Sequence, residues 1–316
     1  MPPKPPTPIC PKCGYDQSGE IATWSTQCPT QGTCNECGLQ FDWLNIFNPH
    51  LTRLPWYTEH ARSPWQLLRR TPSTLLRLVL PSIFWKPIKP TIIINIRTLV
   101  LWYLFLALTS HLAVSAVYAV SYYIRIRARA GWNWNRFING GFYSYAELAF
   151  NSIFRGVFEM WTPVGASGLN TVSVQLSAAT AFSNIYLRPI AISIGINLMW
   201  LIILLVIPTT RRIAKIRTAH VLRAFVLSML ATLLILQLSR YSIRTSSFYW
   251  YMHLELLGQS PSHQLIAIWQ LFFWPAAIVH SWKIKPAKLL IILGTIAAVL
   301  TGLVLNLVVF ITPDFI

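Results

Sequence analysis

Charged residues are scarce in this chain, and acidic residues are the scarcest. Only 11% of the 316 residues are charged, and 9 Asp and Glu stand against 26 Lys and Arg. An average soluble domain carries about 25% charged residues, so the deficit argues against a soluble globular protein. The formal charge of +17 would suit nucleic acid, but the hydrophobic fraction of 54% favours the anionic cytoplasmic leaflet of a membrane as the counter-charge.

The sequence also lacks recognisable catalytic and targeting motifs. There is no HExxH, GxSxG, phosphate loop or dinucleotide fingerprint, and we assign no catalytic residue. The N-terminal stretch MPPKPPTP has no apolar core, so we expect no cleavable signal peptide. We expect residues 1–9 to form a disordered or polyproline leader.

Cysteine is absent beyond Cys37, and four of the five cysteines form two CxxC pairs, each followed by glycine. Each pair presents two sulfurs to one metal from a tight turn, and the glycine leaves room for backbone amides to fold toward them. Two such turns complete a tetrahedral four-sulfur site with no open position. The spacing therefore predicts a zinc ribbon over residues 10–47, with one structural zinc ion bound by Cys10, Cys13, Cys34 and Cys37.

Cys28 is left over; we interpret it as a spare thiol, with ligand exchange or redox sensing as alternatives. A redox role for the CxxC pairs is the alternative to metal binding. Because free thiolates need a reducing compartment, the N-terminus is expected in the cytosol. Because the ribbon over residues 10–47 is too short to bury a large hydrophobic core, we expect metal binding to supply most of its stability. We expect the site to be covered by Tyr15, Trp24, Phe41 and Trp43.

The stretches CPKCGYDQSG and CPTQGTCNECGLQFDW resemble the N-terminal ribbon of uncharacterised multi-span membrane proteins of planctomycete bacteria. The similarity extends through PWYTEHAR (Pro55 to Arg62) and PSIFWKP (Pro81 to Pro87) to the first apolar run. The resemblance implies a multi-span protein of a bacterial inner membrane. It implies no reaction.

Long apolar runs dominate the chain from Thr98 onward, and a spanning helix needs about 20 such residues. The predicted fold is mainly α, a polytopic membrane domain over 98–316 attached to a small β zinc ribbon. We expect five spans, near 98–124, 189–208, 221–239, 264–282 and 289–311, with Arg223 snorkelling to the interface. A polar stripe at Glu147, Asn151, Arg155 and Glu159 predicts an interfacial helix over 145–161, with a re-entrant or sixth spanning helix as alternatives.

The distribution of basic residues predicts the orientation. With five spans and the N-terminus inside, 18 Lys and Arg lie inside and 8 outside, which satisfies the positive-inside rule. The RIRAR run just after the first span falls on the wrong side in this arrangement. The cysteine argument places the N-terminus on the same side independently.

Residues 48–97 are basic and rich in proline and tryptophan. Thr52 to Arg97 holds eight basic residues and one acid, Glu59, and proline interrupts the stretch at Pro72 and Pro81. We predict a juxtamembrane segment that lies on the inner leaflet with its arginines on lipid phosphates. Binding of nucleic acid, through cations interleaved with aromatic rings, is the less favoured alternative.

Polar residues inside the predicted spans are few. His111 and Asn197 are interpreted as interhelical hydrogen-bonding groups, with a proton or substrate path through His111 as the alternative. The fifth span carries a small-residue stripe that predicts close helix packing: Gly294, Ala298, Gly302 and Asn306.

Three functions fit these features. The favoured hypothesis is a non-enzymatic membrane protein whose ribbon recruits a cytosolic protein partner. The second is a small transporter or channel with the ribbon as a regulatory domain. The third is a lipid-acting membrane enzyme, whose candidate groups on the outer side are Glu147, Glu159, His253, Glu255 and His263.

Overall fold

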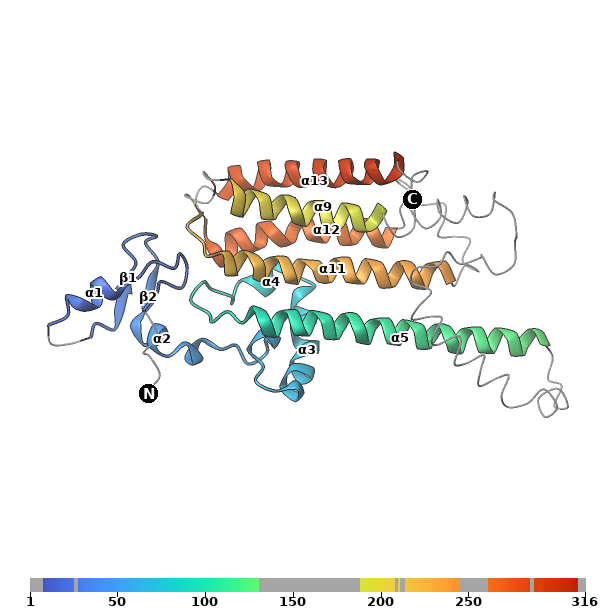
Figure 1. The fold of residues 1–316 in the computed structure, drawn as a ribbon, viewed down its shortest axis with the longest axis horizontal. Helices are drawn as coiled ribbons and strands as arrows, with labels where there is room; N and C mark the ends of the chain where they lie inside the picture. Colours follow the sequence, from blue (N-terminus) through green and yellow to red (C-terminus); the bar gives the residue numbers. More distant parts are fainter. Residues whose placement is uncertain are drawn as a thin grey trace. The chain divides into compact units, whose positions relative to one another are not determined.

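The computed structural model describes residues 8–25, 28–130, 188–207, 210, 214–244, 261–284 and 287–311. Within them the chain is mainly helical, with one two-stranded sheet near the N-terminus (Figure 1). The predicted helix over 145–161 lies outside these residues, as do the first seven residues of the predicted leader. The chain divides into two compact units, and the first comprises Met1–Tyr103, Ile194–Leu230 and Ile268–Thr301.

All five apolar runs form helices, as predicted. Two of these helices, α9 (Arg188–Leu201) and α12 (Pro261–Ala276), continue as the π-helical turns η4 (Ile202–Val206) and η7 (Ala277–Trp282). The long helices are α5 (Ile96–Ala130), α9 (Arg188–Leu201), α11 (Thr218–Arg244), α12 (Pro261–Ala276) and α13 (Ala287–Ile311).

Three stretches of the described chain are helical, long and apolar enough to cross a membrane: Ile96–Val114, Leu265–Trp282 and Ala287–Val308. Ile190–Val206 and Thr218–Leu233 are shorter apolar helices. The structure is thus compatible with a membrane protein, while the full set of five spans stays a prediction.

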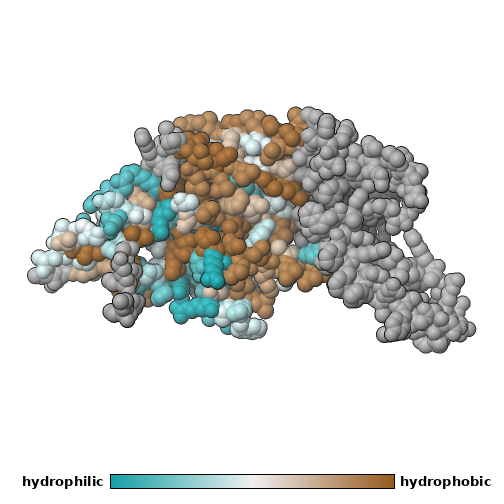
Figure 2. All heavy atoms as spheres, viewed as in Figure 1, coloured by the Kyte–Doolittle hydropathy of each residue, from teal (hydrophilic) through white to brown (hydrophobic). Residues whose placement is uncertain are grey.

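Helix α13 exposes a continuous series of large aliphatic side chains. Leu289, Ile292, Leu293, Ile296, Leu300, Leu303 and Leu307 are each 42% to 58% exposed. Soluble monomers rarely expose contiguous apolar patches beyond a few hundred Å², whereas lipid imposes no such penalty. Figure 2 shows hydrophobic residues gathered over the helices and hydrophilic residues over the N-terminal ribbon.

The ribbon consists of short elements. Strands β1 (Gln31–Thr33) and β2 (Gln40–Asp42) pair antiparallel with Gly32 opposite Phe41, between helices α1 (Ser18–Ala22) and α2 (Trp43–Phe47). Ile9 forms an isolated bridge with Asp16, and the Pro8 carbonyl accepts from the Gln17 amide at 2.8 Å. Pro8 and Ile9, the last two residues of the predicted leader, are therefore bonded to the ribbon.

Residues 48–97 fold into the short 3-10 helices η1 (Pro49–Thr52) and η2 (Thr58–His60), then α3 (Pro64–Leu78) and α4 (Pro81–Trp85). The Ser63 hydroxyl caps α3 by accepting from the Gln66 amide. The prediction that Pro72 breaks this stretch was wrong, because α3 continues through it. Pro72 is exposed, so its ring lies outside the packed side of α3, and only Pro81 starts a new helix.

Part of this segment is buried rather than laid on a surface. Tyr57, Phe84, Trp85 and Ile88 are fully buried. The Trp85 ring lies 5.4 Å from Phe273 and 6.2 Å from Trp282, centroid to centroid. The prediction of a juxtamembrane segment on the inner leaflet did not include this packing, and α3 keeps Trp65 71% and Leu76 75% exposed.

Arg223 does not snorkel as predicted, because it is only 1% exposed and its counter-charge lies in the buried segment. Its Nε atom lies 2.8 Å from Oε2 of Glu59, which is also fully buried, and its Nη2 donates to Glu59 Oε1 at 3.0 Å. Nη2 also donates to the Ile93 carbonyl at 2.7 Å, and Glu59 Oε1 accepts from the Asn95 amide at 2.6 Å. The Glu59 carboxylate therefore compensates the Arg223 charge inside the protein, and the guanidinium does not need to reach water.

Asn197 confirms its predicted role as an interhelical group. Its Oδ1 accepts from the Ser228 hydroxyl of α11 and from the Trp274 indole of α12, the latter at 3.1 Å. The small-residue face of α13 also packs closely, since a Cβ on Gly294 would lie 2.5 Å from the Trp200 ring of α9. His111 is half-buried in α5, and its role stays a prediction.

The Glu59–Arg223 pair gives a stability prediction. Glu59→Gln leaves a buried guanidinium without counter-charge, so we expect a loss of about 3–5 kcal/mol in the free energy of unfolding. Adding Arg223→Met should restore part of that loss. Unfolding of the full chain in detergent micelles measures both. Glu36→Gln, which breaks an exposed pair with Lys215, is the matched control and should cost at most about 1 kcal/mol. Equal losses in the two Glu→Gln variants would contradict this account.

Candidate metal centre

Four cysteine sulfurs meet at one point of the ribbon. The Sγ atoms of Cys10, Cys13, Cys34 and Cys37 all lie within 4.8 Å of one another. The Cys10–Cys37 distance is 3.7 Å and the Cys13–Cys34 distance 3.6 Å. Tetrahedral zinc, with Zn–S bonds of about 2.3 Å, requires sulfur separations of about 3.8 Å. The four sulfurs therefore fit one tetrahedral metal ion, as the sequence predicted.

The two CxxC loops are built alike. In the first loop, the Cys10 amide donates to the Tyr15 carbonyl at 2.8 Å and the Gly14 amide donates to the Cys10 carbonyl at 2.9 Å. The second loop repeats both bonds, at 2.9 and 2.8 Å, among Cys34, Gly38 and Leu39. Because the bonded residues have the same spacing in both loops, each loop presents its two sulfurs in the same way.

Glycine is required at the fourth position after the first cysteine of each loop. Gly14 has φ +81° and Gly38 has φ +68°, a left-handed conformation that L side chains disfavour. Nothing lies within 4 Å of a Cβ built on Gly38, so the backbone angle, and not space, selects glycine there.

The thiols differ in proton affinity. Burial raises the pKa of Cys37 to about 11 and that of Cys10 well above its ordinary value. For Cys34, burial also acts upward, but the backbone amides of Cys37 and Glu36 more than offset it and lower the pKa. A cation must therefore displace protons from at least two of these thiols when it binds at neutral pH.

An aromatic shell covers the sulfurs. Phe41 and Trp43 are buried with the cysteines, and Trp24 packs edge-on against Trp43 at 4.8 Å between ring centroids. Tyr15 was expected in this shell but is 46% exposed. Gly32 makes the shell compact, since a Cβ there would lie 2.6 Å from the Trp43 Nε1 atom.

Gln17 is a polar contact of the site that sequence reasoning missed. Its side chain is 1% exposed, and its Nε2 atom donates to the Cys34 sulfur at 3.3 Å. Its Oε1 atom has no partner among the described residues, so the amide acts on the site through its N–H group. Gln17 lies outside both CxxC pairs, and no spacing rule identifies it.

The ribbon docks onto the first turn of α11 and the residues just before it. The Arg217 amide donates to the Lys12 carbonyl at 2.7 Å, and His220 Nε2 donates to the Pro11 carbonyl at 2.8 Å. From the second CxxC loop, the Glu36 carboxylate pairs with the Lys215 ammonium at 3.0 Å. These contacts join residues up to 209 positions apart, which is why sequence patterns did not predict them.

The arrangement is suited to structure rather than catalysis. Four sulfurs saturate a tetrahedral ion, so no position is left for a reactive water or substrate. Cys28 is exposed and lies outside the cluster, with its Sγ donating to the Pro29 carbonyl at 3.4 Å. Comparison with protein-family models, curated proteins and solved structures found no significant match to this chain.

Metal content is directly testable. We expect the purified full chain to hold about one zinc ion bound by four sulfurs at about 2.3 Å, measured by elemental analysis and X-ray absorption. Replacing Cys34 and Cys37 together by serine should abolish binding, because two of the four ligands are lost. Cys28→Ser is the control and should leave zinc content intact. Zinc retained in the double variant would refute the ligand set.

Gln17 gives a second prediction. Gln17→Leu removes the N–H group that stabilises the Cys34 thiolate, and loss of such outer-shell partners typically lowers metal affinity about 10- to 100-fold. Competition of the full chain against a zinc chelator measures this change. Gln31→Leu, an exposed position on β1, should leave the affinity unchanged. Equal affinities for both variants would show that the Gln17 amide plays no part in metal binding.

Proposed function

We propose that this chain is an integral protein of a bacterial inner membrane, in which a zinc ribbon on the cytosolic face recruits a protein partner. The observation that carries the proposal is the closed four-sulfur centre beside an open, partly apolar groove on the same ribbon. A saturated metal shapes the ribbon but performs no reaction, so the surface that it shapes is the functional feature.

The membrane arrangement supports this proposal. Three described helices are long and apolar enough to cross a bilayer, and two shorter apolar helices accompany them. Counting all five as spans puts the basic N-terminal segment and 18 of the 26 Lys and Arg on the cytosolic side. The same side offers the reducing environment that four free thiols need.

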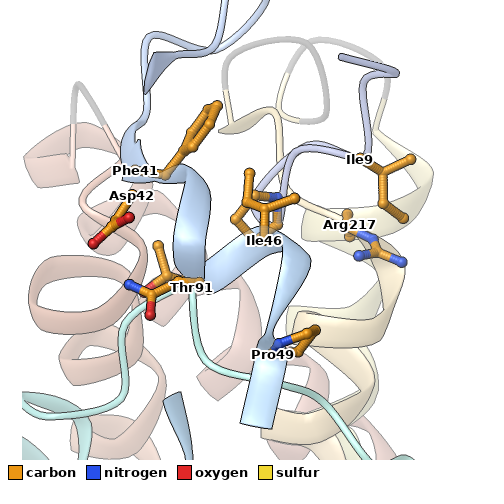
Figure 3. Close-up of a pocket in the computed structure, with 9 residues that line it drawn as sticks. Ile9, Phe41, Asp42, Ile46, Pro49, Thr91 and Arg217 are labelled. Carbon is orange, nitrogen blue, oxygen red and sulfur yellow. The ribbon is translucent and has the colours of Figure 1, made fainter. Parts of the chain in front are cut away.

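The groove has a volume of about 330 Å³ and lies between the ribbon and residues at Thr91 and Arg217. Ile9, Phe41 and Ile46 supply apolar walls, and in the view of Figure 3 Asp42 and Arg217 lie on opposite sides of Ile46. Ligand pockets range from about 300 to 1,000 Å³, so this groove holds a few side chains rather than a large cofactor.

Exposed apolar residues extend this surface on neighbouring elements. Leu44 is 56%, Phe47 38% and Leu51 61% exposed on α2 and η1. Apolar walls flanked by one acid and one base suit a short protein segment with hydrophobic side chains and polar flanks. We therefore assign the groove to a segment of a cytosolic protein.

Crosslinking of the full chain in its own membrane, followed by identification of the adduct, tests recruitment. Asn45→Trp fills the groove, and Cys34→Ser with Cys37→Ser unfolds the ribbon. Each change should reduce the adduct with a cytosolic protein about tenfold or more, the scale of losing an interface hot spot. Thr33→Trp, an exposed polar position of β1 outside the groove, is the matched control.

Zinc content and membrane abundance of the Trp variants should match those of the parent chain. An adduct that persists at full yield in Asn45→Trp would remove the groove from the proposal. An adduct that also survives loss of the metal site would overturn the recruiting role of the ribbon.

A further inference from the structure

We propose that a second cleft, beside the N-terminus of α5, binds a phosphate group carried by the headgroup of an anionic membrane lipid. The cleft has a volume of about 340 Å³, and its walls include Arg53, Arg62, Ile93, Asn95 and Thr98. This proposal rests on the membrane location of the chain and is independent of partner recruitment by the ribbon.

The two arginines of the cleft carry charge that no carboxylate of the described part of the chain compensates. Neither Arg53 nor Arg62 has a carboxylate within 4.0 Å among the described residues. The Nη1 atom of Arg53 is buried and has no acceptor among those residues. A shielded guanidinium N–H group without an acceptor is unfavourable, and phosphate oxygens are the acceptors that arginine binds most strongly.

One further guanidinium group, that of Arg70, reinforces the positive potential, and a second one, that of Arg223, is paired within the wall. Burial and the nearby Arg62 charge lower the pKa of Arg70, whose Nη1 atom is also buried without an acceptor in the described chain. Arg223 is 1% exposed and bonds Glu59 and the Ile93 carbonyl, both part of the cleft wall, while its own Nη1 lacks an acceptor among the described residues.

The remaining titratable residues of the wall do not oppose an anion. The Glu59 charge is compensated by Arg223 at 2.8 Å. Burial lowers the pKa of His60, so its ring is neutral at pH 7. Both ring nitrogens are engaged, with Nδ1 accepting from the Leu54 amide at 2.7 Å and Nε2 donating to the Ile93 carbonyl at 3.1 Å. The net field of the wall is therefore that of the arginines.

The N-terminus of α5 also adds positive potential to the cleft. Asn95 Oδ1 caps the helix by accepting from the Thr98 amide at 3.2 Å. The N-terminus of a helix carries partial positive charge, and here Asn95 and Thr98 both line the cleft. A helix terminus alone would not define a site, but it adds to the shielded arginine of a formed cleft.

Apolar surface beside the cleft favours a lipid over free phosphate. Leu101 follows Thr98 by three helical residues, about 4.5 Å along the axis, and is 55% exposed on a stretch apolar enough to cross a membrane. Trp65 lies three residues after Arg62 in the sequence and is 71% exposed at the start of α3. A phosphate in the cleft thus lies where attached acyl chains meet apolar side chains.

The test uses the full chain, loaded with zinc, in mixed micelles of a zwitterionic detergent. The probe is phosphatidylglycerol, titrated and followed by the amount retained on the protein. Arg53→Gln with Arg62→Gln should weaken retention about tenfold, because two charge-assisted contacts are lost. Lys86→Gln with Lys89→Gln removes the same charge from exposed positions of the same segment, and should change retention less than about twofold.

Zinc content and the unfolding temperature report on folding of each variant. Arg62→Glu reverses one exposed charge without disturbing a buried atom, and should also weaken retention even if the double variant misfolds. Equal retention in the Arg62→Glu and Lys86/Lys89 variants would overturn the site.

A second arm titrates inorganic phosphate in the same micelles without phosphatidylglycerol. If a lipid is the occupant, millimolar phosphate should neither bind detectably nor displace phosphatidylglycerol. Phosphate binding that depends on Arg53 and Arg62, with no preference for the lipid, would overturn the lipid assignment. These measurements do not involve the ribbon's partner, so their failure is distinguishable from failure of recruitment.

Discussion

The buried pair between Glu59 and Arg223 is the constraint on which the first unit depends. Arg223 places a charge inside an apolar bundle, and an uncompensated charge there costs several kcal/mol. Glu59, more than 160 residues away in the sequence, neutralises this charge. Its carboxylate also accepts a hydrogen bond from the Asn95 amide, where α5 begins. One acidic side chain thereby fixes residues 48–97 against α11 and sets the starting point of the first apolar helix.

The same helical turn of α11 holds the ribbon. His220 and Arg223 are three residues apart, so they share a face of the helix. His220 binds the Pro11 carbonyl beside the first metal ligand, whereas Arg223 binds Glu59 at the wall of the phosphate cleft. The metal centre and the cleft are therefore attached to one rigid element. Removing the metal should loosen the ribbon while leaving the ion pair and the arginines of the cleft in place, which keeps the two proposed activities separable.

The sequence predicted those features that depend on residues close together along the chain. Two CxxC turns with their glycines predicted the sulfur cluster, and uninterrupted apolar runs predicted five helices. Sequence reasoning failed where a side chain finds its partner across the fold. Nothing near Arg223 shows that Glu59 neutralises it, and Gln17 becomes a contact of Cys34 only after the ribbon closes. Pro72 misled because proline removes one helical bond, a loss that an exposed position tolerates when the rest of α3 packs well.

Arg217 connects the metal loops to the groove assigned to a partner. Its amide binds the Lys12 carbonyl, and its side chain lies 3.5 Å from the place of a Cβ on Gly14 while also lining the groove. Four thiolates around a zinc ion carry two formal negative charges, and a guanidinium close to the first loop offsets part of them. Gly14 is required for its left-handed backbone, and the Arg217 side chain packs beside it at an ordinary van der Waals distance. Metal loading should therefore govern the position of Arg217, and with it the charged side of the surface offered to a partner.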